Sequence, residues 1–229
     1  MLKPQIFIYW GPGTYLGGRN DVAVMFQKNY YEYHQWITFS YLDNNVKKGD
    51  VILFPGGEAE ECMEYLKTKN NMSADLVRIK IKEYIDMGVH YLGICAGSYL
   101  ASNPHDNFEY LGIFEYNGDR DGSNNQGRVD LRINEEYSIL NGGNNVLFDQ
   151  GPIFYLAIPS DFQVLARFIN VPEKTFIGVN GKKFIDTPAI LYKKNIDKGN
   201  ILLFTVHYEN GNVTKQHTNN FLIFLINVS

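Results

Sequence analysis

Residues 90–101 read HYLGICAGSYLA, an apolar run that ends at Cys95, between Gly93 and Gly97. The first five residues have the length and composition of a buried β-strand, and those after Cys95 resemble the start of a helix. A glycine on each side of the cysteine permits a sharp turn, because a side chain at either position would collide with neighbouring backbone. The pattern predicts that Cys95 stands on a strained turn that projects its sulfur from the carboxyl edge of a sheet.

Apolar strands alternate with helix-like segments on the amino-terminal side of this turn. The expected strands are Gln5–Trp10, Trp36–Tyr41, Val51–Phe54 and His90–Ile94. A glycine-rich turn occupies residues 11–18, and Asn20 or Asp21 is expected to cap the helix that follows it. An amphipathic helix is expected over Ser73–Met87, with Ser73 as N-cap and Gly88 as stop. The apolar positions at helical spacing in that segment are Leu76, Ile79, Tyr84 and Met87, with Val77 and Ile81 beside them.

Strands and turns dominate the second half of the chain. The expected strands are Arg128–Ile133, Asn145–Phe148, Ile153–Ala157, Val164–Phe168, Phe184–Tyr192 and Ile201–Val206, and a helix is expected over Val213–Ile226. Alternation of β and α in the first half predicts an α/β fold with a doubly wound, mostly parallel sheet and flanking helices. The later strands are expected to add antiparallel members. Because no repeat or linker interrupts residues 1–229, we expect a single domain.

Size and charge exclude several classes of function. The chain has 229 residues, 45% of them hydrophobic, and a formal net charge of -4 without a Lys/Arg run. Nucleic acid and anionic membranes are therefore not expected as partners. No apolar run approaches the roughly 18 residues of a membrane-spanning helix. The first residues are expected to enter a strand rather than form a signal peptide.

Only two cysteines occur, Cys62 and Cys95, and neither belongs to a CxxC pair or to a Cys/His cluster with zinc spacing. We therefore expect a reducing, cytoplasmic location, no metal site and no cofactor. Cys62 lies among carboxylates, which disfavour a thiolate, and is interpreted as structural. Free cysteines are often small core residues, and this alternative applies to Cys95 as well. Its flanking glycines and its place between strand and helix favour a nucleophile instead.

A thiolate nucleophile needs a base, and the base needs a group that orients it. His207 follows the apolar run Ile201–Val206, so it is expected at the same carboxyl edge as Cys95. Glu209 lies two residues later, which in extended backbone puts both side chains on one side of the chain. The remaining histidines are interpreted as core, edge, loop or terminal-helix residues: His34, His90, His105 and His217.

Acyl chemistry also needs donors for an oxyanion. The backbone N–H of Ala96 is one candidate, and Gly56 or Gly57, in the Pro-Gly-Gly turn after a buried strand, is the second. The alternative for that turn is a tight turn and nothing more. Arg19, beside the glycine-rich loop, is a candidate for pairing with a substrate carboxylate, although a surface role is the simpler interpretation. The loop itself lacks the GxGxxG spacing and the lysine of nucleotide-binding loops.

Together the turn at 55–57, the motif at 93–97 and the HYE motif at 207–209 resemble the class I glutamine amidotransferase-like superfamily and its Cys-His-Glu triad. The segment YLGICAGSY at 91–99 is most similar to the amidotransferase-like domain at the amino terminus of eukaryotic biotin–protein ligases, and residues 151–155 resemble a Gly-rich, aromatic stretch of that family. The resemblance implies a flavodoxin-like sheet. This chain differs from the glutaminases of the superfamily at two positions. They carry glutamine and proline there, and this chain carries Tyr99 and Tyr208. Both tyrosines become candidates for substrate contacts.

The expected function is a cysteine amidase or hydrolase of this superfamily that acts on a small amide or γ-glutamyl-like substrate through a thioester. The alternative is a non-catalytic ligand-binding or regulatory module on the same scaffold, which the two tyrosines favour. A third possibility is redox or aldehyde chemistry at the thiol. A small-molecule substrate is expected, whereas a homo-oligomer and an ammonia-accepting partner both stay open.

Overall fold

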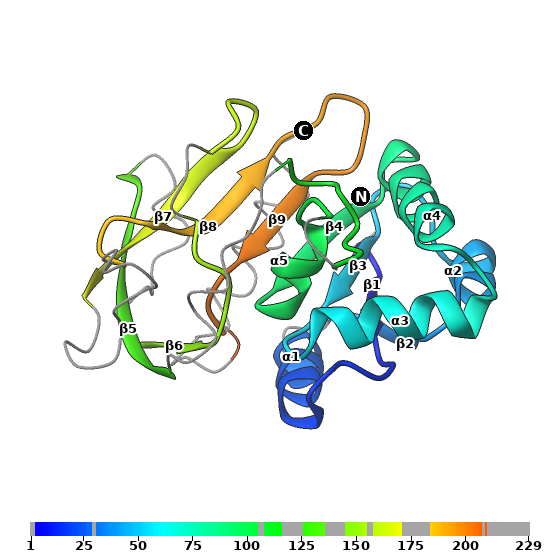
Figure 1. Ribbon diagram of the computed structural model, residues 1–229, viewed down its shortest axis with the longest axis horizontal. Helices are drawn as coiled ribbons and strands as arrows, with labels where there is room; N and C mark the ends of the chain where they lie inside the picture. Colours follow the sequence, from blue (N-terminus) through cyan, green and yellow to red (C-terminus); the bar gives the residue numbers. More distant parts are fainter. Residues whose placement is uncertain are drawn as a thin grey trace.

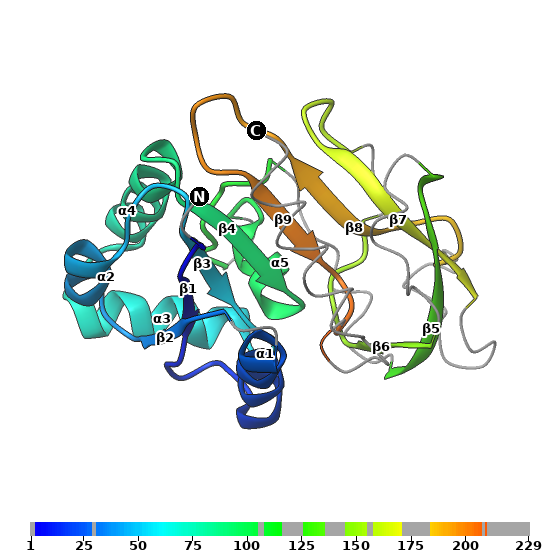
Figure 2. The ribbon, with the colours of Figure 1, turned by 180° about the vertical axis from the view of Figure 1, so that it is seen from behind.

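The computed structural model describes residues 3–28, 31–104, 108–115, 126–135, 145–154, 158–170, 184–207 and 209, which contain one nine-stranded sheet with helices against it (Figures 1 and 2). The strands are β1 (Ile6–Tyr9), β2 (Tyr33–Trp36), β3 (Val51–Phe54), β4 (His90–Ile94), β5 (Gln126–Ile133), β6 (Val146–Asp149), β7 (Gln163–Asn170), β8 (Pro188–Lys193) and β9 (Ile201–Phe204). The helices are α1 (Leu16–Lys28), α2 (Phe39–Asn45), α3 (Ala59–Asn70), α4 (Ala74–Asp86) and α5 (Ala96–Ala101).

The sheet is half parallel and half antiparallel. Its order is β2-β1-β3-β4-β9-β8-β7-β5-β6. The pairs from β2 to β9 are parallel, and the pairs from β9 to β6 are antiparallel. The short connection between β8 and β9 accounts for the change, because a parallel pair needs a crossover of a dozen or more residues. The added antiparallel strands were predicted, but the description of the sheet as mostly parallel was wrong.

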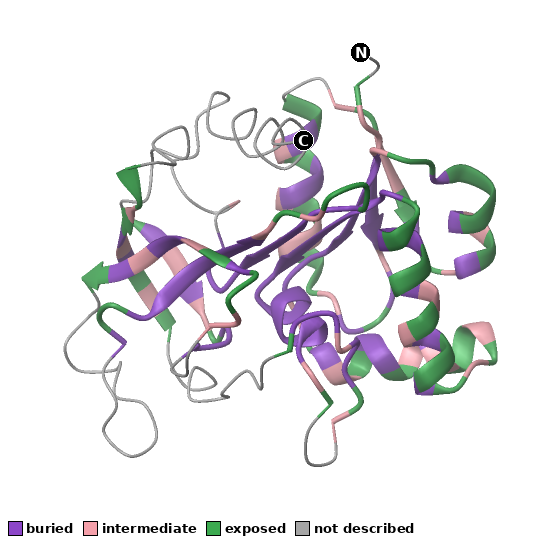
Figure 3. Cartoon of the chain, turned by 90° about the horizontal axis from the view of Figure 1, so that it is seen from above, coloured by how far each residue is buried: buried purple, intermediate pink, exposed green. Residues whose placement is uncertain are grey.

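The parallel half has helices on both faces. Successive side chains of a strand point in opposite directions, so its buried strands present an apolar surface on each side for helices to cover. Ile6 and Ile8 of β1 belong to the apolar cluster that includes Phe26 of α1. Phe7 and Tyr9 belong to the other cluster, which contains the buried faces of α2, α3, α4 and α5. Figure 3 shows the result, with buried residues concentrated in the central strands and on the helix faces turned toward them.

Three elements of the first half differ from prediction. The strand predicted at residues 36–41 is not there beyond Trp36: β2 ends at Trp36 and α2 begins at Phe39, where the Thr38 side chain accepts a hydrogen bond from the Tyr41 amide. Aromatic and β-branched composition favoured a strand there, but the Thr38 cap starts a helix. Helix α1 begins at Leu16, before Asn20 and Asp21, so neither of them caps it. Helix α3 was not predicted.

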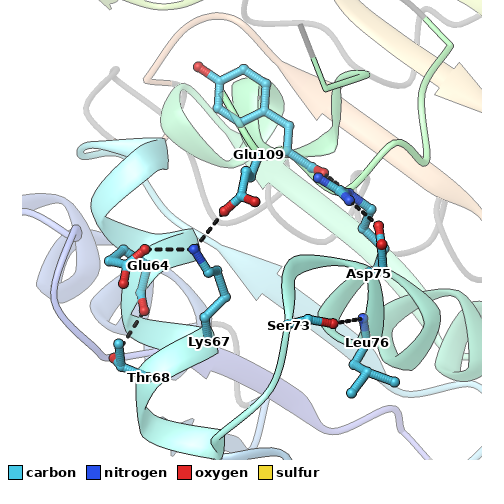
Figure 4. A network of polar contacts seen from close by, with 9 residues as sticks. Glu64, Lys67, Thr68, Ser73, Asp75, Leu76 and Glu109 are labelled. Atoms are coloured by element: carbon cyan, nitrogen blue, oxygen red, sulfur yellow. Dashed lines mark hydrogen bonds and ion pairs between the residues drawn. The ribbon is translucent and has the colours of Figure 1, made fainter. Parts of the chain in front are cut away.

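Helix α4 confirms its predicted cap, since the Ser73 side chain accepts from the Leu76 amide (Figure 4). Its buried face is only partly the predicted one. Three of the expected core residues are buried, namely Val77, Ile81 and Tyr84. The other three are about half exposed, at 50–52%: Leu76, Ile79 and Met87. A helix turns 100° per residue, so six positions spread over so wide an arc cannot all face one sheet.

An ion pair with α3 and a hydrogen bond with α4 fasten residues 108–115 in place (Figure 4). Lys67 on α3 contacts Glu64 at 2.8 Å and Glu109 at 2.6 Å. The Nε atom of Arg78 on α4 donates to the Tyr110 carbonyl oxygen at 2.6 Å. Exposed ion pairs each stabilise a fold by about 0–1 kcal/mol. Their effect here is to place Tyr110, whose hydroxyl contacts Glu60 at the start of α3.

Five of the six strands predicted for the second half are present with shifted ends, but residues 153 and 154, the described part of the predicted strand Ile153–Ala157, belong to no strand. The segment Phe184–Tyr192 begins with a turn, because the Thr187 amide and hydroxyl both donate to the Phe184 carbonyl oxygen, so β8 starts at Pro188. Several predictions fall outside the described residues: the end of the strand at 155–157, the helix at 213–226, and the side chains of His105, Tyr208 and His217. Among the helices that the structure describes, none has the length and apolar character needed to cross a membrane.

Candidate active site

Cys95 stands between β4 and α5 on a turn that only a narrow set of residues can form. Its backbone has φ 51° and ψ -105°, an unusual conformation for a residue other than glycine. A Cβ atom on Gly93 would lie 2.6 Å from the Gly97 carbonyl oxygen, and one on Gly97 would overlap the Phe54 carbonyl oxygen. The steric argument made from the sequence is therefore confirmed, and the strain is concentrated at the cysteine.

The thiol of Cys95 lines a small cavity of ≈ 90 Å³, and the residue is 5% exposed. Its Sγ atom lies 3.4 Å from the carbonyl oxygen of Asp149, at the end of β6. A core cysteine would be enclosed by apolar side chains on all sides. Cys95 instead has apolar neighbours on the sheet side and, on the other, a cavity whose wall includes several polar side chains.

His207 and Glu209 follow β9, the strand next to β4. The His207 amide donates to the Leu147 carbonyl oxygen at 2.7 Å, which fixes this segment against β6. The Nδ1 atom of His207 lies 2.9 Å from Oε1 of Glu209. The Cys95 side chain is also close enough to the ring to be among the causes that raise the pKa of His207. The structure thus brings together the three residues that the sequence nominated as nucleophile, base and orienting group.

The electrostatics of the three residues favour a charged histidine. Burial disfavours the imidazolium, but the Glu209 carboxylate and the Cys95 sulfur outweigh burial and raise the pKa of His207 well above its usual value of 6.5. His207 is 6% exposed, and the Glu209 side chain is fully buried. A protonated imidazole beside a sulfur is the environment that holds a thiolate in cysteine enzymes.

The two glycines of the 55–57 turn occupy different places. Gly57 lines the cavity with Cys95. Gly56 lies behind it, against the imidazole ring of His207, and its carbonyl oxygen accepts a hydrogen bond from the Tyr15 amide at 3.2 Å. Ala96 is the first residue of α5, where backbone N–H groups lack a partner within the helix. Gly57 thus lines the same cavity as Cys95, and Ala96 directly follows it, whereas Gly56 lies against the histidine; the oxyanion role of Gly57 and Ala96 stays a prediction.

The predicted substrate-contact residues have different positions. Tyr99 lines the cavity, and its hydroxyl donates to the Gly151 carbonyl oxygen at 3.3 Å. Arg19 is held elsewhere: its Nη1 atom donates to the Trp10 carbonyl oxygen at 2.9 Å, and its guanidinium lies 5.0 Å from the centre of the Trp10 ring. Tyr208 lies outside the described residues. Arg19 is thus placed to brace the glycine-rich loop rather than to line the cavity.

Most of the cavity wall was missed from the sequence. The lining residues without a predicted role are Tyr15, Glu58, Ala59, Glu60, Tyr110, Asp149 and Gln150. Glu58 and Glu60 directly follow the Pro-Gly-Gly turn, so their position was available as a signal. Tyr110 and Asp149 come from segments with no motif, and tertiary structure alone brings them to the thiol.

The other cysteine and the other described histidines lie apart from this cavity. Cys62 is buried on α3, where burial, followed by the charges of Glu61 and Glu58, raises its pKa. His90 begins β4, at the edge of the sheet opposite Cys95. Its Nδ1 atom accepts from the Asn200 amide at 2.9 Å, and burial lowers its pKa to about 4. Within the described residues no three His, Cys, Asp or Glu side chains gather as metal ligands.

The mixed sheet, with a cysteine turn after β4 and a His-x-Glu segment after the adjacent strand β9, has an amidotransferase-like fold. Comparison with protein families identifies the narrower group. The family described as "Biotin-protein ligase, N terminal" matches residues 4–121, more than half of the chain. The chain belongs to this family.

Solved structures share the fold at low sequence identity. A protein from Thermoplasma acidophilum, provisionally named as a component of GMP synthase, superposes with a TM-score of 0.59 at 13% identity over 100% of this chain and 96% of its own. A cytoplasmic protein from Salmonella typhimurium gives 0.57 at 15% identity, with coverage of 97% and 98%. The carbohydrate deacetylase Agd3 gives 0.54 at 10% identity, covering 96% of this chain and 32% of its own. A search of curated proteins by sequence finds no match.

Proposed function

We propose that the protein is a cysteine-dependent amidase or acyl-transfer hydrolase in which Cys95 is the nucleophile. The observation that carries the proposal is that His207 interacts with both Glu209 and Cys95, and that Cys95 lines a cavity. Perturbed histidines with a specific charge partner are concentrated at functional sites. The raised pKa of His207 and the strained turn at Cys95 are independent signs of the same role.

In the proposed reaction the Cys95 sulfur attacks the carbonyl carbon of an amide, and a C–S bond forms as the carbonyl oxygen becomes an oxyanion. Backbone N–H groups of Ala96 and Gly57 hold that oxyanion. The imidazolium of His207 gives its proton to the leaving amine, the C–N bond breaks, and a thioester remains. Water then loses a proton to His207 and attacks the thioester, which releases the acid and restores the thiolate. Glu209 orients His207 throughout.

A non-catalytic ligand-binding module is the second candidate. The observation in its favour is Tyr99, which stands where glutaminases of the superfamily carry a glutamine. Its side chain fills part of the cavity wall, and the remaining space of ≈ 90 Å³ admits only a small group. In this alternative the cavity captures a ligand or part of a partner, and Cys95 does not turn over. Thiol redox chemistry, the third possibility, requires no base and leaves the contact between His207 and Glu209 without a role.

Alkylation of Cys95 by iodoacetamide, followed by mass spectrometry from acid to alkaline pH, tests the proposal. An activated thiolate should alkylate at neutral pH at least about tenfold faster than an unperturbed thiol, whose pKa is about 8.5. The rate should fall in His207→Ala, and Cys95→Ser should remove the labelled peptide. A panel of small amides then separates the candidates: release of ammonia or amine that depends on Cys95 supports the enzyme. Binding that persists in Cys95→Ala, without turnover in the wild type, supports the module.

The proposal includes the cellular location, the substrate size and the partners of the protein. Both cysteines are free thiols, which supports a reducing, cytoplasmic location, and the small cavity supports a small molecule as substrate. A homo-oligomer or an ammonia-accepting partner is compatible with it.

A further inference from the structure

Among the described residues, the charged side chains that line the cavity at Cys95 are all negative. Three carboxylates line it: Glu58 and Glu60 at the start of α3, and Asp149 at the end of β6. Among the described residues that line it, none is a lysine, an arginine or a histidine. Two segments far apart in the chain therefore bring negative charge to the same small space beside the thiol.

Two of these carboxylates carry no compensating cation within the described part of the chain. Glu58 accepts a hydrogen bond from the Tyr15 hydroxyl at 3.1 Å. Asp149 accepts from the side-chain amides of Gln126, at 3.2 Å, and Gln150, at 3.5 Å. These donors are neutral, so they orient the carboxylates without cancelling their charge. A carboxylate has about four acceptor sites, which leaves capacity for a further donor.

Tyrosine hydroxyls contact two of the carboxylates that line the cavity. The Tyr110 hydroxyl donates to Glu60 at 2.6 Å, as Tyr15 does to Glu58. The pKa of Tyr15 is raised first by its hydrogen bond to Glu58 and then by burial, and the charges of Asp149 and Cys95 add to it. Tyr15 thus lies close enough to Glu58, Asp149 and Cys95 for each of them to affect its pKa.

Helix stability explains part of this arrangement only. Acidic residues at a helix N-terminus interact favourably with the helix dipole, and α3 has Glu58 at its N-cap and Glu60 and Glu61 in its first turn. That role needs no particular direction of the side chain. It does not account for Asp149, which reaches the cavity from the other side of the site. Glu61, in the same helix turn, does not line the cavity and provides a matched control.

We propose that the substrate of the Cys95 site carries a positively charged group, a protonated amine or a guanidinium, which Glu58 and Asp149 bind while the substrate carbonyl faces the thiol. Glu60 adds to the same negative potential. The covalent step rests on the proposed function above, whereas the charge preference of the cavity stands without it. Substrates with a carboxylate near the scissile amide are disfavoured, because like charges repel.

Charged thiol reagents measure this preference directly. The Cys95 thiolate attacks the sulfenyl sulfur of a methanethiosulfonate, a disulfide forms, and methanesulfinate leaves. The rates of the 2-aminoethyl (cationic) and 2-sulfonatoethyl (anionic) reagents are compared in a Cys62→Ala background, with 2-mercaptoethanol as the uncharged reference thiol. We expect the cation-to-anion rate ratio at Cys95 to exceed the reference ratio about tenfold or more, from Coulomb attraction by two nearby charges.

Three variants assign the effect to named residues. Glu58→Gln and Asp149→Asn should each lower the ratio about threefold or more, and Glu61→Gln should leave it unchanged. A ratio equal to that of the reference thiol, or an equal loss in Glu61→Gln, overturns the proposal. The neutral methyl reagent reports the thiol itself: if it is slow at neutral pH while the ratio stays high, the proposed function fails and the charge preference survives.

If Cys95 reacts with none of the reagents, the temperature of thermal unfolding in the presence of charged amides tests the charge preference of the cavity. The cationic 5-aminopentanamide is compared with glutaramate, an anionic amide of similar size. Stabilisation by the first alone, lost in Asp149→Asn, supports the proposal, because a ligand stabilises the state that binds it. Equal shifts with the two amides, or none with either, reject it.

Discussion

Gly56 lies directly against the imidazole ring of His207, so closely that a Cβ atom at Gly56 would overlap the ring carbon Cε1. That carbon joins the two ring nitrogens, one of which contacts Glu209. The glycine turn after β3 and the histidine after β9 are therefore a single packing unit. The Pro-Gly-Gly turn has a function beyond reversing the chain, because it leaves the room in which the histidine ring sits.

Substitution of Gly56 by alanine should displace the His207 ring and slow iodoacetamide labelling of Cys95 at neutral pH by about tenfold or more, since a displacement near 1 Å at a reacting site has large effects. Far-UV circular dichroism should show that the fold is kept. Gly17→Ala is the control, because the added Cβ meets nothing within 4 Å. It should leave labelling unchanged and stabilise α1 by about 0.5–1 kcal/mol. Equal labelling in Gly56→Ala and wild type would contradict the packing argument.

The raised pKa of His207 makes stability depend on pH in a definite direction. A base whose pKa is higher in the folded than in the unfolded state stabilises the fold fully at pH values below the unfolded-state pKa, here near 6.5. The stabilisation is lost as the pH rises through the folded-state pKa. The free energy of unfolding should therefore decline from neutral toward alkaline pH. In His207→Ala this part of the decline should be absent. Urea unfolding at a series of pH values measures it, and identical slopes in the two proteins would show that the ring is not protonated in the fold.

The two cysteines should differ sharply in reactivity although both are buried. Burial and nearby carboxylates raise the pKa of Cys62, and it does not line the cavity at Cys95. In native protein at neutral pH, Cys95 should react with iodoacetamide and Cys62 should not. In urea both should react at similar rates. Labelling of Cys62 at the rate of Cys95 in native protein is the result that this account does not allow.

Ile79 and Ile81 give a matched test of which face of α4 is in the core. They are the same residue type on one helix, but Ile79 is 52% exposed and Ile81 is 1% exposed. Ile81→Ala should cost about 2–5 kcal/mol of unfolding free energy because it leaves a cavity. Ile79→Ala should change stability by about 0.5 kcal/mol or less. Similar losses from both substitutions would mean that the exposed face of α4 is covered.

Prediction from the sequence succeeded for those site residues whose position depends on residues next to them in the chain. The turn at Cys95 could be foreseen because its two glycines are needed for local steric reasons. His207 and Glu209 could be foreseen because a polar pair after an apolar strand must emerge at a sheet edge. The prediction failed at residues 36–41, where composition favoured a strand but one side-chain cap, at Thr38, started a helix. It failed again for Leu76, Ile79 and Met87, because apolar spacing alone does not tell which part of a broad stripe meets the sheet.

Short stretches of sequence were thus sufficient to identify Cys95, His207 and Glu209 as site residues, since strand ends and glycine turns are short-range features. The charge of the cavity was not accessible in the same way. Asp149 lies 54 residues from Cys95 in the chain, and its carbonyl oxygen nevertheless contacts the sulfur. Tyr110 reaches the site only because α3 and α4 hold residues 108–115. Such contacts depend on how separate elements pack, and packing is set by the summed burial of side chains from the whole fold rather than by any one segment.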